Sequence, residues 1–323
     1  MALAINKLSK RFGNTWALRD VSFEVADGSV IGLFGASGSG KSTLLNAIAG
    51  TVKATSGSIL VGGRDVTKLK AKERGISLHI GHGDGGIKGI LSDFFDRSAS
   101  GESQLSRFEQ SSATAGRIWL LDAPFSKMDP QQRDVAFAEI REAAKVGGRI
   151  VFFASSDFDQ IIDLTDEVAV LDRGEIVQTG TPQEIYDDPR SVKLARATGQ
   201  NNLIPARRLT STNADLPEFY TIDGAHRVFA QSTEKGRLGA INQNVTLAIR
   251  PEQVVMSMGV SFPEDNLLKG VVTAIKFRGA ISLIEFDIGG LTIETRVFKP
   301  VGINIGDECM LGLPPHRIQI LKD

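Results

Sequence analysis

The fold of the first part of this chain is decided by one run of nine residues, Gly35-Ala36-Ser37-Gly38-Ser39-Gly40-Lys41-Ser42-Thr43. The run fits the phosphate-loop pattern G-x-x-x-x-G-K-[ST] without a mismatch. An apolar run at residues 30–34 precedes it, and another apolar run follows at residues 44–49. The pattern therefore predicts a buried strand, a glycine-rich loop and the start of a helix.

Such a loop has a chemical purpose. Glycines let backbone N–H groups close around phosphate oxygens, and the helix N-terminus adds a dipole that favours negative charge. Lys41 is expected to reach the terminal phosphates, and Ser42 is expected to ligate Mg²⁺. We therefore expect ATP and Mg²⁺ to bind at residues 35–43.

Length and composition limit the number of domains, the kind of partner and the cellular compartment that we expect. A chain of 323 residues is expected to hold about two domains. The net charge of −1 gives no electrostatic case for a nucleic-acid partner. The single cysteine, Cys309, excludes an intrachain disulfide and fits a reducing compartment. No apolar run approaches the roughly 18 residues of a membrane span, and the N-terminus lacks a signal-peptide core.

The texture of the sequence changes near residue 200. Before it, strand-like runs at residues 29–34, 58–61, 76–80, 118–121 and 149–154 alternate with helical patterns at 41–49 and 131–144. This alternation predicts an α/β domain, residues 1–198, with a mainly parallel sheet covered on both faces. After it, short β-branched runs are separated by Gly, Asn, Asp and Pro, which predicts a small all-β barrel or sandwich over residues 199–323.

Further motifs, in order along the whole chain, resemble the ATPase subunit of ABC importers of the sugar, polyamine and iron type. Residues 10–13, Lys-Arg-Phe-Gly, are similar to the segment whose aromatic residue stacks on adenine, which gives that role to Phe12. Residues 118–122 resemble the Walker B strand, which ends in the Mg²⁺-orienting Asp122. Residues 126–129 are similar to the D-loop, and residues 168–186 follow the family nearly residue for residue. Residues 248–252 and 271–279 resemble its OB-like regulatory domain.

The chain departs from this family where hydrolysis is carried out. The resemblance implies a glutamate after Asp122 that polarises the attacking water, and Ala123 stands there. Gly81 stands at the expected glutamine of the Q-loop, and Ser156 at the expected switch histidine. The signature motif has become residues 98–102, Ser-Ala-Ser-Gly-Glu, and only 17 residues (98 − 81) remain for a helical subdomain that grips membrane subunits. Alanine has no proton acceptor, so no general base is available at this position.

Three interpretations remain open from the sequence. The first is an importer subunit that binds Mg-ATP, hydrolyses it weakly or not at all, and works with a competent second ATPase and permease subunits. It would lie in the cytoplasm, peripheral at the inner membrane. The second is a nucleotide-responsive regulatory or interaction protein that is not coupled to a permease. The third is an ordinary active importer ATPase, so the sequence leaves enzymatic activity undecided.

Overall fold

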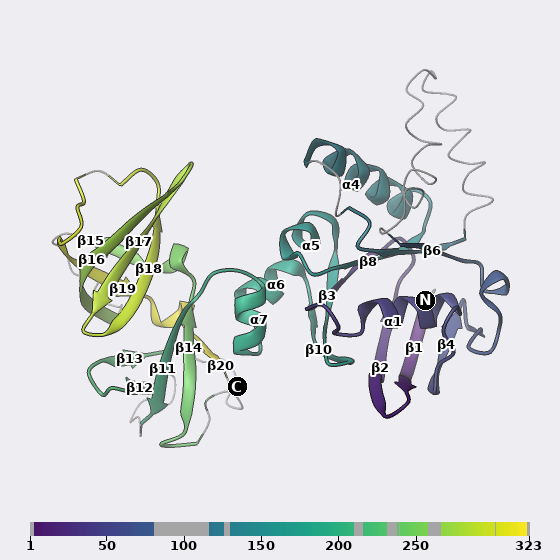
Figure 1. The fold of residues 1–323 in the computed structure, drawn as a ribbon, viewed down its shortest axis with the longest axis horizontal. Coiled ribbons are helices and arrows are strands. Elements are labelled where there is room, and N and C mark those ends of the chain that lie inside the picture. Colours follow the sequence, from purple (N-terminus) through teal and green to yellow (C-terminus); the bar gives the residue numbers. More distant parts are fainter. Residues whose placement is uncertain are drawn as a thin grey trace. The chain divides into compact units, whose positions relative to one another are not determined.

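The computed structural model describes residues 3–80, 116–125, 130–209, 216–230, 238, 240–257, 266–300 and 302–321. It divides the chain into two compact units, Met1–Ile185 and Tyr186–Asp323 (Figure 1). The boundary between residues 198 and 199 stays a prediction. Among the described residues, no helix has the length and apolar character needed to cross a membrane.

The first unit is built on a six-stranded sheet with the order β10-β9-β3-β8-β7-β6. Its strands are β3 (Val30–Phe34), β6 (Ile76–Ile80), β7 (Ile118–Asp122), β8 (Ile150–Ser155), β9 (Glu167–Asp172) and β10 (Glu175–Gly180). Five of them run parallel, and β10 alone pairs antiparallel, with β9. Every residue of β3 and β8 is buried, as expected for strands covered on both faces. The predicted α/β class is confirmed.

A second sheet in this unit was not predicted. Its order is β2-β1-β4-β5, formed by β1 (Leu3–Phe12), β2 (Thr15–Val25), β4 (Ser56–Val61) and β5 (Arg64–Asp65), and all its pairs are antiparallel. The placement of residues 58–61 in the mainly parallel sheet was therefore wrong. Their strand pairs instead with β1, because the antiparallel β1–β2 hairpin offers it an edge.

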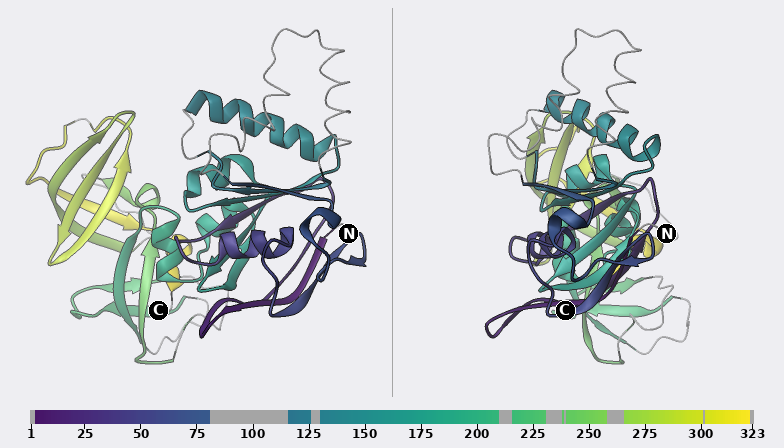
Figure 2. Two further views of the ribbon diagram at one scale, coloured as in Figure 1. Left: turned by 45° about the vertical axis from the view of Figure 1, so that its right-hand side comes forward. Right: turned by 90° about the vertical axis from the view of Figure 1, so that its right-hand side faces the viewer.

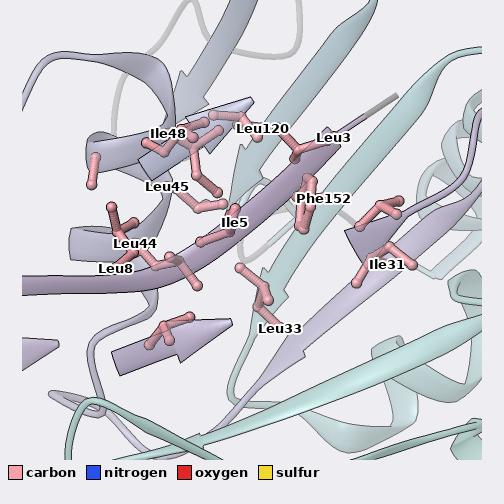
Figure 3. Packing of buried hydrophobic residues seen from close by; sticks show 14 of the residues in the cluster. Leu3, Ile5, Leu8, Ile31, Leu33, Leu44, Leu45, Ile48, Leu120 and Phe152 are labelled. Carbon is pink, nitrogen blue, oxygen red and sulfur yellow. The ribbon is translucent and has the colours of Figure 1, made fainter. Parts of the chain in front are cut away.

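Helix α1 (Lys41–Ala49) lies between the two sheets (Figure 2). Its apolar side chains, among them Leu44 and Ile48, pack with Leu3 and Ile5 of β1 and with Phe152 of β8 (Figure 3). Burial of such side chains contributes roughly 1.5–3 kcal/mol each. This packing holds the N-terminus of α1, and hence the glycine-rich loop, at the end of β3.

The described residues form further helices in the first unit and at the start of the second. They are η1 (Ala71–Glu73), α4 (Pro130–Lys145), α5 (Phe158–Leu164), α6 (Pro182–Asp187) and α7 (Val192–Ala197). Helix α4 lies on the opposite face of the large sheet from α1 (Figure 2), and α5 contacts β3, β8 and α4. Asp157 caps α5 by accepting a hydrogen bond from the Asp159 N–H at 3.1 Å.

Within its described residues, the second unit is all-β apart from α7, the end of α6 and two short 3₁₀ turns, η3 (Pro251–Gln253) and η4 (Pro315–Arg317). One five-stranded sheet has the order β13-β12-β11-β14-β20, with bounds Arg227–Phe229, Glu218–Thr221, Asn202–Arg208, Asn244–Ile249 and Gln319–Leu321. The other has the order β15-β19-β16-β17-β18, with bounds Val255–Ser257, Glu308–Leu313, Asn266–Arg278, Ile281–Ile288 and Leu291–Val297. Both contribute to one apolar core, which confirms the predicted OB-like class.

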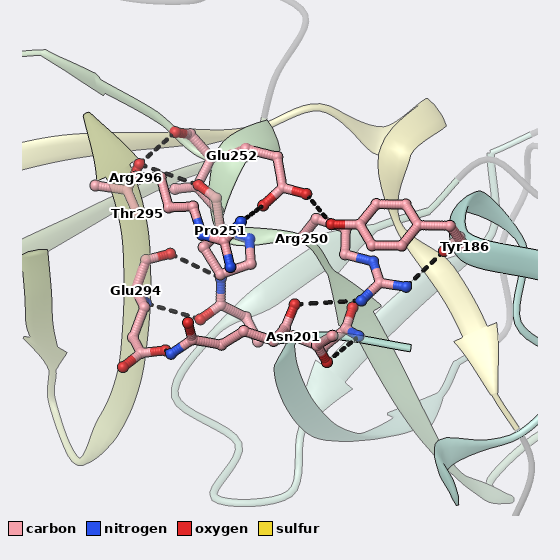
Figure 4. Close-up of polar contacts among 12 residues, drawn as sticks. Tyr186, Asn201, Arg250, Pro251, Glu252, Glu294, Thr295 and Arg296 are labelled. Atoms are coloured by element: carbon pink, nitrogen blue, oxygen red, sulfur yellow. Dashed lines mark hydrogen bonds and ion pairs between the residues drawn. The ribbon is translucent and has the colours of Figure 1, made fainter. Parts of the chain in front are cut away.

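Two contacts join elements of this second unit. The side-chain amide of Asn202 accepts a hydrogen bond from the Glu294 N–H at 2.7 Å and donates one to the Glu294 carbonyl at 2.8 Å, so it pairs with β18 as a strand would. The Arg250 guanidinium stacks on the Tyr186 ring at 3.7 Å, and the Tyr186 hydroxyl donates to Glu252 (Figure 4). These polar contacts hold Tyr186 and Asn202, which lie on either side of α7, against the β strands of this unit.

Candidate nucleotide site

The glycine-rich loop runs from the end of β3 to the start of α1 and is held by backbone contacts on two sides. Gly40 adopts a φ of 114°, and a Cβ there would lie 2.7 Å from the Ala17 carbonyl oxygen. The Gly174 N–H donates to the Ser39 carbonyl at 2.8 Å, and the Arg19 N–H donates to the Gly174 carbonyl at 2.8 Å. Strand β2 and the β9–β10 turn therefore lie directly against the loop, where only glycine fits at position 40.

Lys41 turns its side chain back over this loop. Its Nζ donates hydrogen bonds to the carbonyl oxygens of Gly35 at 2.7 Å and Ala36 at 2.9 Å. Burial lowers the pKa of Lys41 from its ordinary value, and the negative charge of Asp122 opposes that shift. The site thus contains a partly desolvated cation and a carboxylate close enough to influence it.

A cavity of about 510 Å³ opens over the loop. Its walls come from β2, the glycine-rich loop and α1, the carboxyl ends of β7 and β8, and the β9–β10 turn. The lining residues are Thr15, Trp16, Ala17, Arg19, Ser37, Gly38, Gly40, Lys41, Ser42, Thr43, Asp122, Ala123, Ser155, Ser156, Arg173 and Gly174. The carboxyl ends of parallel strands are where open α/β sheets bind ligands.

The ends of β7 and β8 carry two of the departures noted in the sequence. Ala123 follows Asp122 with a φ of 45°, and its N–H donates to the Ala154 carbonyl at 3.0 Å. Beside it, Ser155 is buried and its hydroxyl accepts from the Asp157 N–H at 3.0 Å, whereas Ser156 is exposed. Within the described part of the chain, Asp122 is the only acidic side chain that lines the cavity, and no histidine lines it.

The structure brings most of the predicted site residues together. Those that line the cavity are Ser37, Gly38, Gly40, Lys41, Ser42, Thr43, Asp122, Ala123 and Ser156. Gly35, Ala36 and Ser39 belong to the same loop without lining the cavity. Gly81, the signature segment at residues 98–102 and the D-loop segment at residues 126–129 lie outside the described residues.

Phe12 lies outside the lining of the cavity, and several residues that the sequence did not indicate line it instead. Phe12 is 50% exposed, does not line the cavity, and has the Lys10 ammonium 4.6 Å from its ring centre. Trp16, Arg19 and Arg173 do line it, and none was predicted. Residues 3–25 were not predicted to form strands, so no signal in the sequence indicated that Trp16 would reach the cavity.

The donor set suits a magnesium ion carried by a nucleotide. Ser42 supplies a hydroxyl oxygen and Asp122 a carboxylate oxygen to the same cavity. Mg²⁺ takes oxygen ligands and is commonly held by one or two protein oxygens together with substrate phosphates. The residues present therefore fit the ion.

A glycine-rich loop between a buried parallel strand and a helix, with a lysine and an aspartate facing one cavity, defines a P-loop nucleotide-binding domain. Two family models match the chain, "ABC transporter" over residues 18–84 and "TOBE domain" over residues 247–321. Residues 18–84 therefore match an ABC transporter ATP-binding domain, and residues 247–321 match a TOBE domain.

Similar curated proteins cover most of the chain. The Fe(3+) ions import ATP-binding protein FbpC of Brucella melitensis is 29% identical over 291 residues, 79% of this chain and 80% of the relative. The sulfate/thiosulfate import ATP-binding protein CysA of Mesorhizobium japonicum is 25% identical over 356 residues, 98% of each chain.

Solved structures support the fold of the first unit. A nucleotide-free ATP-binding cassette from an ABC transporter aligns with a TM-score of 0.50 and 22% identity, covering 60% of this chain and 98% of that one. An ATP-binding cassette of an ABC transporter in its ADP conformation aligns with the same values.

Proposed function

We propose that this chain is the ATP-binding subunit of an ABC-type solute importer, and that it binds Mg-ATP with slow or absent hydrolysis of its own. The importer role is supported by the relatives, which are import ATP-binding proteins. In this proposal the chain works in the cytoplasm and attaches to the inner membrane through permease subunits.

Binding is assigned to the loop and its surroundings. Backbone N–H groups of residues 35–43 surround the phosphates, and Lys41 exchanges its two carbonyl partners for phosphate oxygens. Ser42 and Asp122 would hold Mg²⁺, which would offset the negative charge of the terminal phosphates. Each of these roles needs position and charge, and none needs a proton to be removed from water.

The observation that carries the proposal is the composition of the cavity wall. Hydrolysis requires a group that accepts a proton from the attacking water, and such groups contribute about 10²–10⁴-fold in rate. Among the described lining residues, Asp122 is the only carboxylate, and the proposal assigns it to the metal. Ala123 offers a methyl group, and Ser156 offers one hydroxyl in place of an imidazole.

Under this proposal, hydrolysis in the assembled transporter falls to a second ATPase subunit that pairs with this chain. Co-expression with its permease subunits and a candidate second ATPase tests this part. Co-purification of a mixed pair of ATPase subunits supports it, and isolation of a transporter with two copies of this chain and full turnover overturns it.

Binding and hydrolysis can be measured on one sample of purified chain. Titration with ATP in the presence of Mg²⁺ is expected to give saturable binding, and the same sample is expected to release little or no phosphate. The Lys41→Ala variant is the matched control and is expected to lose binding. Steady phosphate release that disappears in Lys41→Ala would overturn the proposal, since it would show turnover at this site.

A further inference from the structure

We propose that Glu285 and Glu294 share one proton in the folded chain, and that this carboxyl pair makes the second unit a pH-sensitive element. The two residues stand directly opposite each other in the antiparallel ladder of β17 and β18. Their side chains therefore leave the sheet on the same face, where the Cβ atoms of such pairs lie about 4.5–5.5 Å apart. Two ionised carboxylates that close repel each other, and one proton between them replaces the repulsion with a hydrogen bond.

The nearest cation balances only one of the two carboxyl groups. The Lys276 ammonium, from β16, forms an ion pair with Glu285. Asp287, two residues along the same face of β17, carries a further negative charge, and its carboxylate accepts a hydrogen bond from the Gly290 N–H at 2.9 Å. One lysine beside two carboxyl groups leaves the second carboxyl, that of Glu294, without a cation of its own.

The other cation on this face is already paired. Arg296 lies two residues from Glu294 on β18, and its guanidinium pairs with Glu252 of η3 at 3.4 Å (Figure 4). With one proton on the carboxyl pair, the charges of the pair and Lys276 sum to zero. Without that proton they sum to −1, so the surroundings favour the state that keeps it.

The pKa values of the two groups follow from these contacts. Burial raises the pKa of Glu294, and the hydrogen bond with Glu285 raises it further. The hydrogen bond from Lys276 lowers the pKa of Glu285. The proton therefore resides on Glu294, whose hydroxyl donates to the Glu285 carboxylate, and the two groups titrate as a pair.

Glu294 also anchors the segment that joins α7 to β11. The Gln200 side-chain amide donates a hydrogen bond to the Glu294 carboxyl group. The Asn202 side chain pairs with the Glu294 backbone, accepting from its N–H at 2.7 Å and donating to its carbonyl at 2.8 Å. When the proton leaves for solvent, repulsion from Glu285 acts on the residue that holds this segment. The contact of β18 with residues 200–202 is therefore where a change of pH is expected to take effect.

The two carboxyl groups contribute to stability with opposite pH dependence. Above the ordinary value of 4.5, the folded chain keeps the Glu294 proton and the unfolded chain has released it. The contribution of Glu294 is therefore complete below pH 4.5 and is lost as the pH rises through its raised pKa. Glu285 contributes above pH 4.5, and its contribution is lost as the pH falls through its lowered pKa. Each proton changes the folding equilibrium constant by at most about tenfold per pH unit.

An NMR titration of the side-chain carboxyl signals in the full chain tests the pair directly. Glu294 is expected to titrate above 4.5, and the Asn202 side-chain amide is expected to shift with the same midpoint. Glu285→Gln is expected to move the Glu294 midpoint down, because the neighbouring charge is gone. Lys276→Met is expected to move it up, because the pair then has no cation.

Chemical denaturation across the same pH range gives a second readout. Glu294→Gln cannot ionise, yet it keeps an N–H donor toward Glu285 and an oxygen acceptor for Gln200. It is expected to abolish the loss of stability that the natural chain shows as the pH rises through the Glu294 midpoint. Glu308→Gln is the matched control, since Glu308 forms an ion pair with Lys269 at 2.8 Å in which both side chains are 62% exposed. It is expected to leave that loss in place.

Two results would overturn the proposal. One is independent titration of Glu285 and Glu294 in the natural chain, with both midpoints near 4.5. The other is a loss of stability in Glu294→Gln at every pH with an unchanged pH dependence, because Glu294 would then act only as a structural link. The titration of the natural chain needs no variant, so it decides the matter even where a variant does not fold. Neither measurement involves ATP, so either result leaves the proposed function standing.

Discussion

The ammonium group of Lys41 lies 2.7 Å from the carbonyl oxygen of Gly35, at the start of the same loop. The lysine therefore already has hydrogen-bond acceptors within the loop. To bind Lys41, a phosphate must form stronger hydrogen bonds than these carbonyls do. Its oxygens are charged, and hydrogen bonds between charged groups are about twice as strong as neutral ones.

The first prediction concerns pH. Burial lowers the pKa of Lys41, so its ammonium form is lost at a lower pH than that of an ordinary lysine. Affinity for ATP is expected to fall as the pH rises through that lowered pKa, because the neutral amine attracts phosphate weakly. Calorimetric titrations across the alkaline range measure it.

The same shift predicts the sign of a stability change. Between the lowered pKa and 10.5 the unfolded chain holds the Lys41 proton and the folded chain has released it. The contribution of Lys41 to the free energy of unfolding therefore rises with pH in that window. An affinity for ATP that stays constant up to pH 10.5 would contradict the buried environment assigned to Lys41.

The second prediction concerns Gly50, which ends α1 at a φ of 83°. A Cβ there would lie 2.4 Å from the Arg74 Nε, and Arg74 is 6% exposed and donates to the carbonyls of Ala47 and Ile48 at 2.8 and 2.9 Å. Gly50→Ala is expected to displace this arginine and to cost about 3 kcal/mol in the free energy of unfolding.

Gly63 is the matched control for that substitution. It has a similar φ of 79°, and nothing lies within 4 Å of its would-be Cβ. Gly63→Ala is expected to cost only the backbone strain, about 1 kcal/mol. Chemical denaturation of both variants gives the comparison, and equal losses would show that Arg74 is not essential to the end of α1.

The third prediction concerns Tyr186. Burial and the neighbouring Glu252 raise the pKa of Tyr186 to about 12. In a Tyr220→Phe variant Tyr186 is the only tyrosine, so the ultraviolet absorbance of tyrosinate reports it alone. Because the folded chain keeps this proton longer than the unfolded chain, the contribution of Tyr186 to stability falls between pH 10 and 12.

Glu252→Gln, made in the Tyr220→Phe background, checks the cause. It removes the negative charge that opposes ionisation, so the pKa of Tyr186 is expected to move down toward 10. If Tyr186 already titrates near pH 10 with Glu252 in place, that result would contradict the contact between the two side chains.

The fourth prediction concerns the site of the lost carboxylate. Ala123→Glu alone is expected to raise ATP hydrolysis no more than about tenfold, well below the 10²–10⁴ of an intact general base, because Ser156 still replaces the imidazole. The double variant Ala123→Glu with Ser156→His is expected to exceed the sum of the single changes. Full family-like turnover in Ala123→Glu would show that one substitution accounts for the whole defect.

Local patterns predicted the parts of this fold that depend on local chemistry. Helix α1 and strand β6 have the bounds expected from apolar periodicity. The β1–β2 hairpin was missed because register shifts interrupt its alternation and exposed Asn6 and Lys7 stand between buried Ile5 and Leu8. Strands of this kind are defined by their partners more than by their own sequence.

The residues of the candidate site also divide into those that local motifs predict and those that only long-range packing brings to the cavity. Lys41 and Ser42 were predictable from the phosphate-loop pattern, and Asp122 from the resemblance of residues 118–122 to a Walker B strand. Trp16, Arg19 and Arg173 were not, because long-range packing of β2 and the β9–β10 turn on the loop brings them to the cavity. The spacing of residues along the chain does not reveal this long-range packing.

The fate of bound ATP tests the central claim most directly. The purified chain, in excess over labelled ATP with Mg²⁺, is incubated for many multiples of a normal turnover time, and the nucleotide is then recovered and identified. The proposed function predicts that the protein-bound label is recovered as intact ATP, and that Lys41→Ala retains none. Recovery of bound label as ADP, absent from the Lys41→Ala sample, would contradict it.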